Sequence, residues 1–149
     1  MHLTYKKKIF LYFLLVFSIF TIIIVAVQQN REKTYKADSF KTGMEAYSKV
    51  IAGYIQYHQL LTSGHIDSLN YVLPLLPKEL RVTIIDRDGC VLFDNDVDSI
   101  HEVENHLDRP EIVKSLSNGN GSNIRQSATT GANYFYYARF FSPYFVRVA

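Results

Sequence analysis

Five aspartates gather in the segment IIDRDGCVLFDNDVD, and carboxylates at this density are typical ligands of a divalent cation. Asp94, Asp96 and Asp98 alternate along the chain, as the oxygen ligands do at the start of a calcium-binding loop. The register then fails, because Ser99 stands where the tight turn needs Gly and Asn105 stands where a bidentate Glu is needed. Asp94, Asp96 and Asp98 therefore remain candidates for a weak divalent-cation site.

The two earlier aspartates have a structural explanation. Asp86 and Asp88 are predicted to shape a tight turn, because short polar side chains cap turns and tolerate their backbone angles. The β-rich runs RVTIID and CVLFD on either side predict a hairpin. We expect Val91 and Phe93 to face the core and Cys90 to lie on the other face, and a lone Cys is expected to be a packed small hydrophobe.

Motifs of catalysis are missing from the sequence. HEVENH has the residue types of a zinc-protease helix, but His101 and His106 are five apart where the metal needs four. His58 is expected to be packed rather than to bind a metal. There is no nucleophile elbow, phosphate-binding Gly loop or dinucleotide fingerprint, and Cys90 has no neighbouring base. We therefore expect this chain to be no enzyme, with no catalytic residue and no cofactor.

Aromatic side chains crowd the C-terminal segment NYFYYARFF, which is predicted to be a strand. Alternation places Tyr134 and Tyr136 on one face and Arg139 on the other, with Arg125 one strand away. Cationic and phenolic groups together could line a ligand pocket, so the predicted ligand-binding residues are Arg125, Tyr134, Tyr136 and Arg139. The alternative is an ordinary core face and a solvated face carrying Arg.

An apolar segment at the N-terminus is predicted to span a membrane. Residues 9–27 hold no charge and would form a helix of about 28 Å, close to the ~30 Å hydrocarbon core. Lysines at 6, 7 and 8 keep the preceding stub in the cytoplasm under the positive-inside rule. A cleaved signal peptide is the alternative, but its apolar region is shorter, and VAVQQN offers no clean cleavage site. Residues 1–8 are then a cytoplasmic stub, 9–27 a transmembrane helix in contact with the lipid bilayer, and 28–149 an extracytoplasmic domain.

Residues ~28–61 are predicted to continue this helix beyond the membrane, ending at a Gly64 cap. Its seam packs either on the domain's own sheet or in a parallel dimer near the membrane, and both can hold in different halves. The seam follows a heptad pattern: Phe40, Met44, Tyr47, Ile51, Tyr54, His58 and Leu61.

The remaining pattern predicts an α+β domain. A short helix at 66–73 precedes the hairpin, and DRPEIVKSL starts another helix with Asp108 as N-cap and Pro110 in the first turn. Three strands follow, with a turn at Thr130–Gly131. We expect a five-stranded antiparallel sheet with helices packed on one face. The formal charge is 16 − 14 = +2, which favours no nucleic-acid partner.

Four segments, taken in order, resemble the extracytoplasmic sensor region of bacterial sensor histidine kinases. They are KKK with the apolar anchor, LRVTIIDRDGCVLFDNDVD, ENHLDRPEI and RQSATTG…YFYYARFF. That resemblance covers most of the chain and implies a PAS-like fold in the bacterial inner (cytoplasmic) membrane. It also implies a homodimer through the membrane and juxtamembrane helices, and an unknown extracytoplasmic ligand.

The function implied is transmission of an extracytoplasmic stimulus in two-component signal transduction. ATP, magnesium and a response regulator are expected only for a kinase domain after Ala149, because the last strand breaks off and the chain is expected to be the N-terminal piece of a longer protein. The same sensor on a chemoreceptor or a cyclic-dinucleotide cyclase, or a stand-alone single-pass interaction module, are the alternatives.

Overall fold

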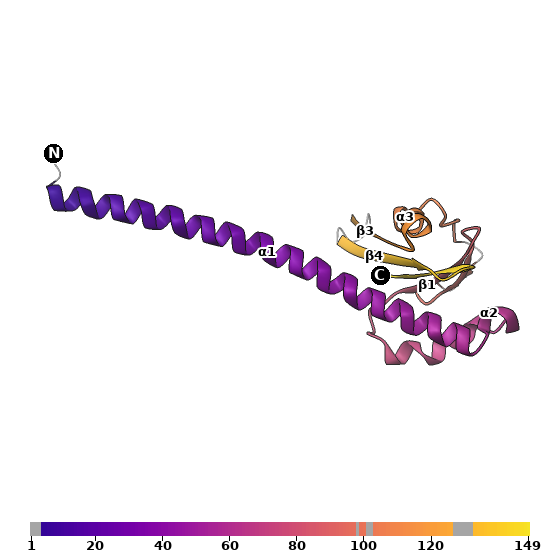
Figure 1. Ribbon diagram of the computed structural model, residues 1–149. Coiled ribbons are helices and arrows are strands. Elements are labelled where there is room, and N and C mark those ends of the chain that lie inside the picture. The colour runs from indigo at the N-terminus through magenta and orange to yellow at the C-terminus, as the bar shows by residue number, and fades with distance from the viewer. Residues whose placement is uncertain (1–3, 98, 101–102, 127–132) are drawn as a thin grey trace. The chain divides into compact units, whose positions relative to one another are not determined.

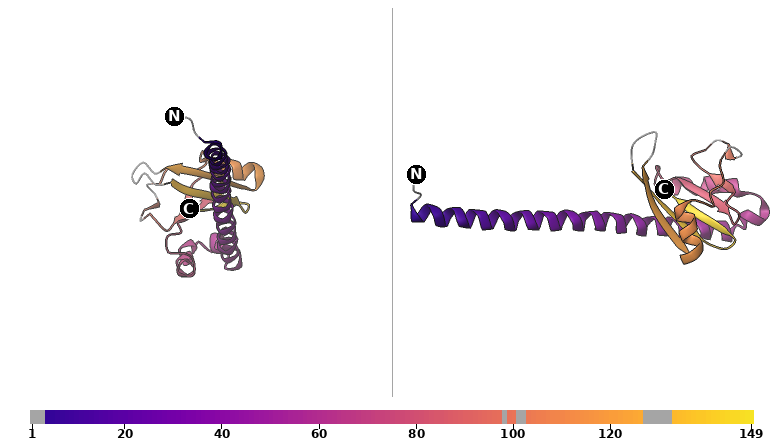
Figure 2. Two further views of the ribbon diagram at one scale, coloured as in Figure 1. Left: turned by 90° about the vertical axis from the view of Figure 1, so that its left-hand side faces the viewer. Right: turned by 90° about the horizontal axis from the view of Figure 1, so that it is seen from above.

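The computed structural model describes residues 4–97, 99–100, 103–126 and 133–149. The chain divides into two units, Met1–Ser39 and Phe40–Ala149, and the helix α1, Tyr5–Tyr57, contributes residues to both. Figures 1 and 2 draw α1 as an unbroken helix. The first unit consists of its N-terminal part. There the stretch Tyr5–Glu32, which contains an 18-residue window with a mean hydropathy of 2.9, is long and apolar enough to cross a membrane.

The second unit contains a five-stranded antiparallel sheet, which confirms the predicted α+β class (Figure 1). The strand order β2-β1-β5-β4-β3 places the last strand of the chain at the centre. The hairpin β1–β2 and the long hairpin β3–β4 flank it on either side. The strands are β1 Val82–Asp86, β2 Val91–Asp94, β3 Asn120–Gln126, β4 Asn133–Phe140 and β5 Tyr144–Val148.

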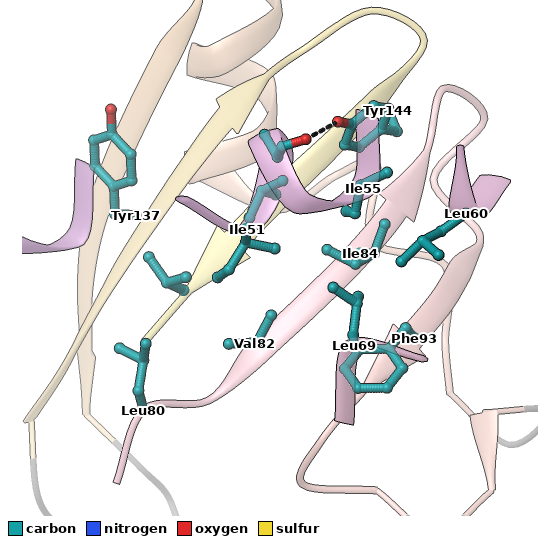
Figure 3. Close-up of a cluster of buried hydrophobic side chains, with 13 residues drawn as sticks. Ile51, Ile55, Leu60, Leu69, Leu80, Val82, Ile84, Phe93, Tyr137 and Tyr144 are labelled. Carbon is teal, nitrogen blue, oxygen red and sulfur yellow. Dashed lines mark hydrogen bonds between the residues drawn. The ribbon is translucent and has the colours of Figure 1, made fainter. Parts of the chain in front are cut away.

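Apolar side chains from the C-terminal part of α1 cover one face of this sheet (Figure 3). Ile51 and Ile55, one turn apart, are buried against Val82 and Ile84 of β1 and the alternate residues of β5. The hydroxyl of Tyr144 donates to the carbonyl oxygen of Ala52 at 3.4 Å. Most of the predicted heptad seam therefore packs on the domain's own sheet: Met44, Tyr47, Ile51, Tyr54 and Leu61.

Two residues of the predicted seam do not take part in that core. Phe40 is 59% exposed, and His58 is exposed with its ring 4.4 Å from the ring of Tyr54. The packing alternative is thus supported for most of the seam, and the dimer stays a prediction.

Helix α3, Pro110–Asn118, lies on the opposite face of the sheet, beside β3 and β4 (Figure 1). Ile112 of α3 packs there with Ile85, Ala138 and Phe145. The prediction that helices cover a single face is therefore wrong. The alternating strands carry apolar residues on both faces, and the short α3 covers part of the second one.

The helical boundaries differ locally from the prediction. α1 ends at Tyr57 because Gln59 adopts a left-handed backbone (φ 50°), and the one-turn helix α2, Leu60–Ser63, follows. Gly64 caps α2 in the left-handed conformation (φ 73°), as predicted. The predicted helix at 66–73 is two 3-10 helices, η1 Ile66–Tyr71 and η2 Leu73–Leu75.

The entry to α3 also differs. Pro110 occupies the first turn as predicted, but the N-cap is Arg109 and not Asp108, and no side chain caps the helix. Val91 and Phe93 were predicted on one face; the structure places Phe93 in the α1-side core and Val91 against the α3-side cluster. A register shift between Ile84 and Ile85 explains this, because a bulge changes the alternation. Cys90 is exposed rather than packed.

Candidate functional site

Four strands place polar side chains close together on the face of the sheet that carries α3. Thr83 of β1 lies opposite Arg147 of β5, and Arg125 of β3 lies opposite Tyr134 of β4. Tyr136 stands two residues beyond Tyr134 and so shares its face. The same alternation that turns the neighbouring valines of β5 toward α1 turns Arg147 into this polar group, where it is only 4% exposed.

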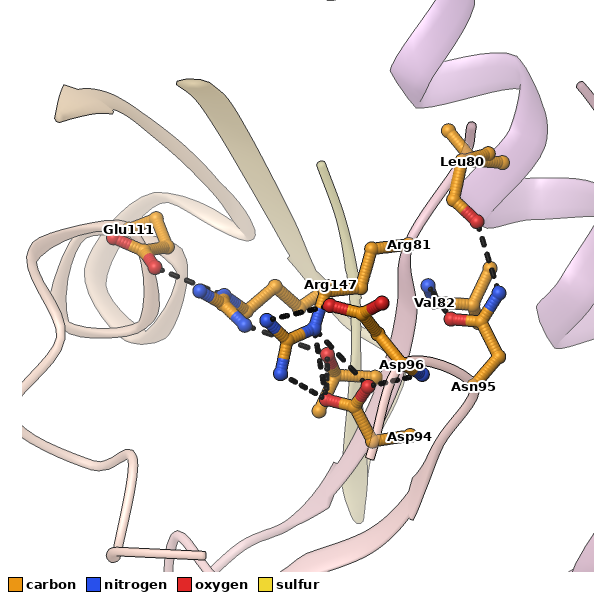
Figure 4. A network of polar contacts seen from close by, with 9 residues as sticks. Leu80, Arg81, Val82, Asp94, Asn95, Asp96, Glu111 and Arg147 are labelled. Atoms are coloured by element: carbon orange, nitrogen blue, oxygen red, sulfur yellow. Dashed lines mark hydrogen bonds and ion pairs between the residues drawn. The ribbon is translucent and has the colours of Figure 1, made fainter. Parts of the chain in front are cut away.

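Arg81 and Asp94 form a two-pronged ion pair at the edge of this group (Figure 4). The Nε and Nη2 atoms of Arg81 donate to Oδ1 and Oδ2 of Asp94 at 3.0 and 3.1 Å. The hydroxyl of Thr83 donates to Oδ2 at 2.9 Å, and the backbone N–H of Asp96 donates to Oδ1 at 3.0 Å. The Asp94 carboxylate is fully buried, so these donors replace the water that it lost.

Glu111 of α3 binds two arginines on this face of the sheet, Arg125 and Arg147. Its Oε1 accepts from Nε of Arg147 at 3.0 Å and from Nη2 of Arg125 at 3.1 Å (Figure 4 shows the first). The carboxylate is fully buried. Its helix can approach β3 this closely because Gly121 lies beneath it, where an added Cβ would overlap the carbonyl oxygen of Glu111.

The ring of Tyr136 holds the same two guanidinium groups. The Cζ atoms of Arg125 and Arg147 lie 4.3 and 4.4 Å from its centroid, within the range of a cation–π contact. Stacking and the shared carboxylate together fix both arginines, so their remaining N–H groups point in defined directions.

A pocket of about 270 Å³ opens over this group. His106, which is 6% exposed, lies in its wall, with Nδ1 2.8 Å from the carbonyl oxygen of Glu104. Burial holds the pKa of His106 below its usual value, and the positive charges of Arg147 and Arg109 lower it further. The lining consists of Arg81, His106, Arg109, Arg125, Gln126, Tyr136 and Arg147.

A second pocket of about 570 Å³ lies next to it and shares Arg81 and Tyr136. Its lining mixes Lys78 with Glu79 and Asp96, so it has no single charge character. The smaller pocket is the better candidate site, because every ionisable side chain in its wall except a tyrosine is basic.

The structure brings together three of the four predicted ligand-binding residues. Arg125, Tyr134 and Tyr136 share the α3 face, with the two tyrosine rings 6.4 Å apart. Arg139 lies on the other face, where it pairs with Glu45 of α1 at 2.9 Å. Alternation along β4 had already assigned Arg139 to the opposite side, and the structure removes it from the site for that reason.

The aspartates predicted to hold a cation have other contacts. Both oxygens of Asp94 accept from Arg81, and Oδ2 of Asp96 lies 3.3 Å from Nη1 of Arg81. Asp98 lies outside the described residues. Across the described parts of the chain, no three His, Cys, Asp or Glu side chains gather where they could hold a metal ion. The weak cation site stays a prediction, and any such ion would compete with Arg81.

The first two aspartates form the turn predicted for them. Oδ1 of Asp86 accepts from the N–H groups of Asp88 and Cys90 at 2.9 and 2.8 Å. The carbonyl of Asp88 accepts from the side chain of Asn105. The predicted turn at Thr130–Gly131 and the residues His101 and Glu102 of HEVENH lie outside the described residues.

Sequence reasoning missed most of the pocket wall: Arg81, His106, Arg109 and Arg147. For Arg147 a signal existed, because YFVRV alternates and puts its Arg opposite the apolar residues. For Arg109 and His106 the sequence offered no such signal, because they lie in a segment without regular structure. Glu111 follows Asp108 by three residues, a spacing typical of a helix-capping pattern, but its carboxylate reaches the sheet instead.

Three comparisons with known proteins add no relative. No family model, no curated protein and no solved structure matches this chain.

Proposed function

We propose that this chain is the extracytoplasmic signal-sensing region of a membrane-bound sensor histidine kinase, with a PAS-like sensor domain anchored by its N-terminal helix. The resemblance of the sequence motifs supports this, together with a five-stranded antiparallel sheet and a helix that is long and apolar enough to span a membrane. The domain would detect a stimulus and pass it to a kinase domain encoded after Ala149.

One observation carries the proposal: two of the segments that carry the resemblance, LRVTIIDRDGCVLFDNDVD and ENHLDRPEI, contact each other directly. The N–H of His106 donates to the carbonyl of Gly89 at 2.8 Å, and the Asn105 side chain donates to the carbonyl of Asp88 at 2.8 Å. Oδ1 of Asn105 in turn accepts from the N–H of Leu107. The Asp-Gly hairpin and NHLDRPE therefore form one structural unit beside the pocket, which gives their joint occurrence a physical reason.

The proposed mechanism is conformational. A stimulus at the sheet would shift or rotate the anchor helices by an ångström or two across a dimer. It can do so only if it binds the two signalling states with different affinities.

The first test is the reading frame after Ala149 in the parent protein. We expect a second apolar segment and then a dimerisation helix with a phosphoacceptor His. Membranes carrying the full-length protein should incorporate acid-labile, base-stable phosphate from ATP. A stop codon after Ala149 would overturn the kinase proposal, and a methyl-accepting or cyclase domain would assign the same sensor to another output.

A second test measures the helix motion. Single cysteines at the exposed positions Ala46 and Val50, with buried Ile51 as the control, should cross-link between subunits at rates that change with signalling state. Cys90→Ser is needed as the background, because Cys90 is exposed and would react itself. Unchanged rates at Ala46 and Val50 would show the mechanism to be wrong.

A further inference from the structure

The smaller pocket on the α3 face has a one-sided charge. Its wall presents four arginines and His106, whereas the two buried carboxylates that pair with them, Asp94 and Glu111, are not part of the lining. The Asp94 and Glu111 side chains are both 0% exposed and line no part of this pocket. A solute entering the pocket therefore meets guanidinium groups first.

Positive charge is in excess at the centre of this group. Arg81 pairs with both Asp94 and the exposed Asp96, but Arg125 and Arg147 share a single oxygen of Glu111. The described carboxylate nearest Arg109 is that of Glu104, which is 86% exposed and lies 3.5 Å away, so solvent screens this pair.

Repulsion between the arginines affects the pKa of Arg147 inside the cluster. Burial lowers the pKa of the Arg147 guanidinium, Glu111 opposes that effect, and repulsion from Arg125 and Arg81 adds to it. A bound anion would relieve this repulsion, because an opposite charge at a few ångströms favours the charged form.

One donor of the cluster has no acceptor. Nε of Arg125 is buried and has no hydrogen-bond partner in the described structure. A buried N–H of this kind costs free energy until an oxygen accepts from it. Its guanidinium already stacks on Tyr136 and pairs with Glu111 through Nη2, so the group is held in place for a ligand.

We propose that this pocket binds a compact oxyanion carrying two or more negative charges, held by Arg125 and Arg147 from the sheet and by Arg109 from the N-cap of α3. Paired oxygens on phosphate, sulfate or a short dicarboxylate match the forked N–H groups of guanidinium. The volume of about 270 Å³ lies below the range typical of drug-sized ligands and suits a small ion. The statement that such an anion is the stimulus rests on the proposed sensing function. The statement that the pocket binds the anion does not depend on that function.

The chain supplies a matched pair of variants. Arg125 and Arg139 both lie in the β3–β4 hairpin, are 29% and 30% exposed, pair with a glutamate and stack on a ring, but they lie on opposite faces. Arg125→Gln removes charge from the pocket, and Arg139→Gln removes the same charge elsewhere.

The experiment is isothermal titration of the full chain in lipid nanodiscs with inorganic phosphate, sulfate and malonate, each at constant ionic strength and with chloride as the blank. We expect saturable binding of at least one of them. Arg125→Gln should weaken it about tenfold or more, as for loss of a charge-assisted hydrogen bond, and Arg139→Gln should change it less than about twofold. The order of the three affinities separates phosphate-like from carboxylate ligands.

Arg109→Gln is the second variant, since Arg109 has few structural contacts, and it carries the test if thermal unfolding shows that Arg125→Gln does not fold. The inference is overturned by the lack of saturable binding for all three anions, or by equal losses in the Arg139→Gln and pocket variants. Absence of binding in a protein whose reading frame does encode a kinase would overturn the anion pocket alone. Anion binding followed by a stop codon would overturn the kinase alone.

Discussion

The two faces of the sheet bury different kinds of side chain. The face toward α1 is an apolar core in which Ile51, Ile55 and Ile84 exclude water, and its one described ion pair between sheet and helix, Arg139–Glu45, lies about one-third exposed. The face toward α3 is apolar at one end only, and at the other end it holds buried charges with a pocket above them. Burying charge costs free energy that apolar packing does not, so this end is the one shaped by something other than stability.

The largest effect should come from the charged face. Glu111→Ala leaves Arg147 buried without its carboxylate, and loss of one partner of a buried pair typically costs about 3–5 kcal/mol. Glu111→Gln keeps the shape and one acceptor oxygen and should cost clearly less. Urea unfolding monitored by circular dichroism measures both. Equal losses for the two variants would mean that the charge of Glu111 does not hold this face together.

The apolar face should respond next. Ile51→Ala removes a fully buried side chain from the α1 core and should cost about 2–5 kcal/mol, according to how far the cavity collapses. Val50→Ala, at a position that is 55% exposed on the same helix, is the control and should change stability by less than about 0.5 kcal/mol. The same urea titration compares them. Similar values would contradict the packing of α1 on the sheet.

The turn beside the charged face should come third. Gly89 has φ +87°, and an added Cβ would overlap Oδ1 of Asn105 and come within 2.7 Å of Cβ of Leu107. Gly89→Ala therefore strains the backbone, at about 1–3 kcal/mol, and pushes the NHL segment away. Gly64→Ala is the control, since that glycine also has positive φ but an added Cβ meets nothing within 4 Å. A smaller loss for Gly89→Ala than for Gly64→Ala would show that the contact is unimportant.

A smaller effect should appear with pH on the charged face. The folded-state pKa of His106 is lowered by burial, Arg147 and Arg109, so the unfolded chain binds the proton more readily. Stability contributed by neutral His106 is then present above the ordinary value of about 6.5 and is lost as pH falls below it. The melting temperature of the wild-type chain should therefore drop more than that of His106→Gln between pH 7.5 and 5.5. Equal drops in melting temperature for the wild-type chain and His106→Gln would show that His106 does not cause this pH dependence.

The smallest effect should come from the exposed ion pair of the apolar face. Arg139→Ala breaks a contact that is about one-third exposed and leaves Glu45 with Lys49 at 2.7 Å. A loss of about 0–1 kcal/mol is expected, because water screens such pairs. Thermal unfolding at low and at high salt measures it. A loss of stability as large as that of Glu111→Ala would show that ion pairs contribute equally on the two faces of the sheet.

Local rules explain how much of the fold could be predicted. The β1–β2 hairpin with its Asp86 turn, the Gly64 cap and the Pro110 helix start depend on neighbours in the chain, so they were readable in advance. The five strands also followed from alternation. The bulge between Ile84 and Ile85 was not readable, because a one-residue shift leaves the hydrophobic pattern almost unchanged.

The candidate site was predictable in part for the same reason. Arg125 and Tyr136 of the pocket wall, and Tyr134 beside them, were found because alternation along the predicted strands assigns faces without knowledge of the fold. Arg81, Arg109 and His106 were missed, since their place in the wall depends on how loops and strand ends return to the sheet.

The sequence by itself determined an apolar N-terminal segment of membrane-spanning length, an α+β domain, the Asp86 turn and the Gly64 cap, because helix length, alternation and turn chemistry are local properties. Only the tertiary structure decided that α3 lies opposite α1 and that Glu111 meets Arg147, 36 residues away. It likewise decided that Arg139 pairs with Glu45 of α1, 94 residues away. These outcomes depend on strand order and helix docking. Both bring charges that are far apart in the sequence into contact in a buried place, where their interaction has a large effect on stability.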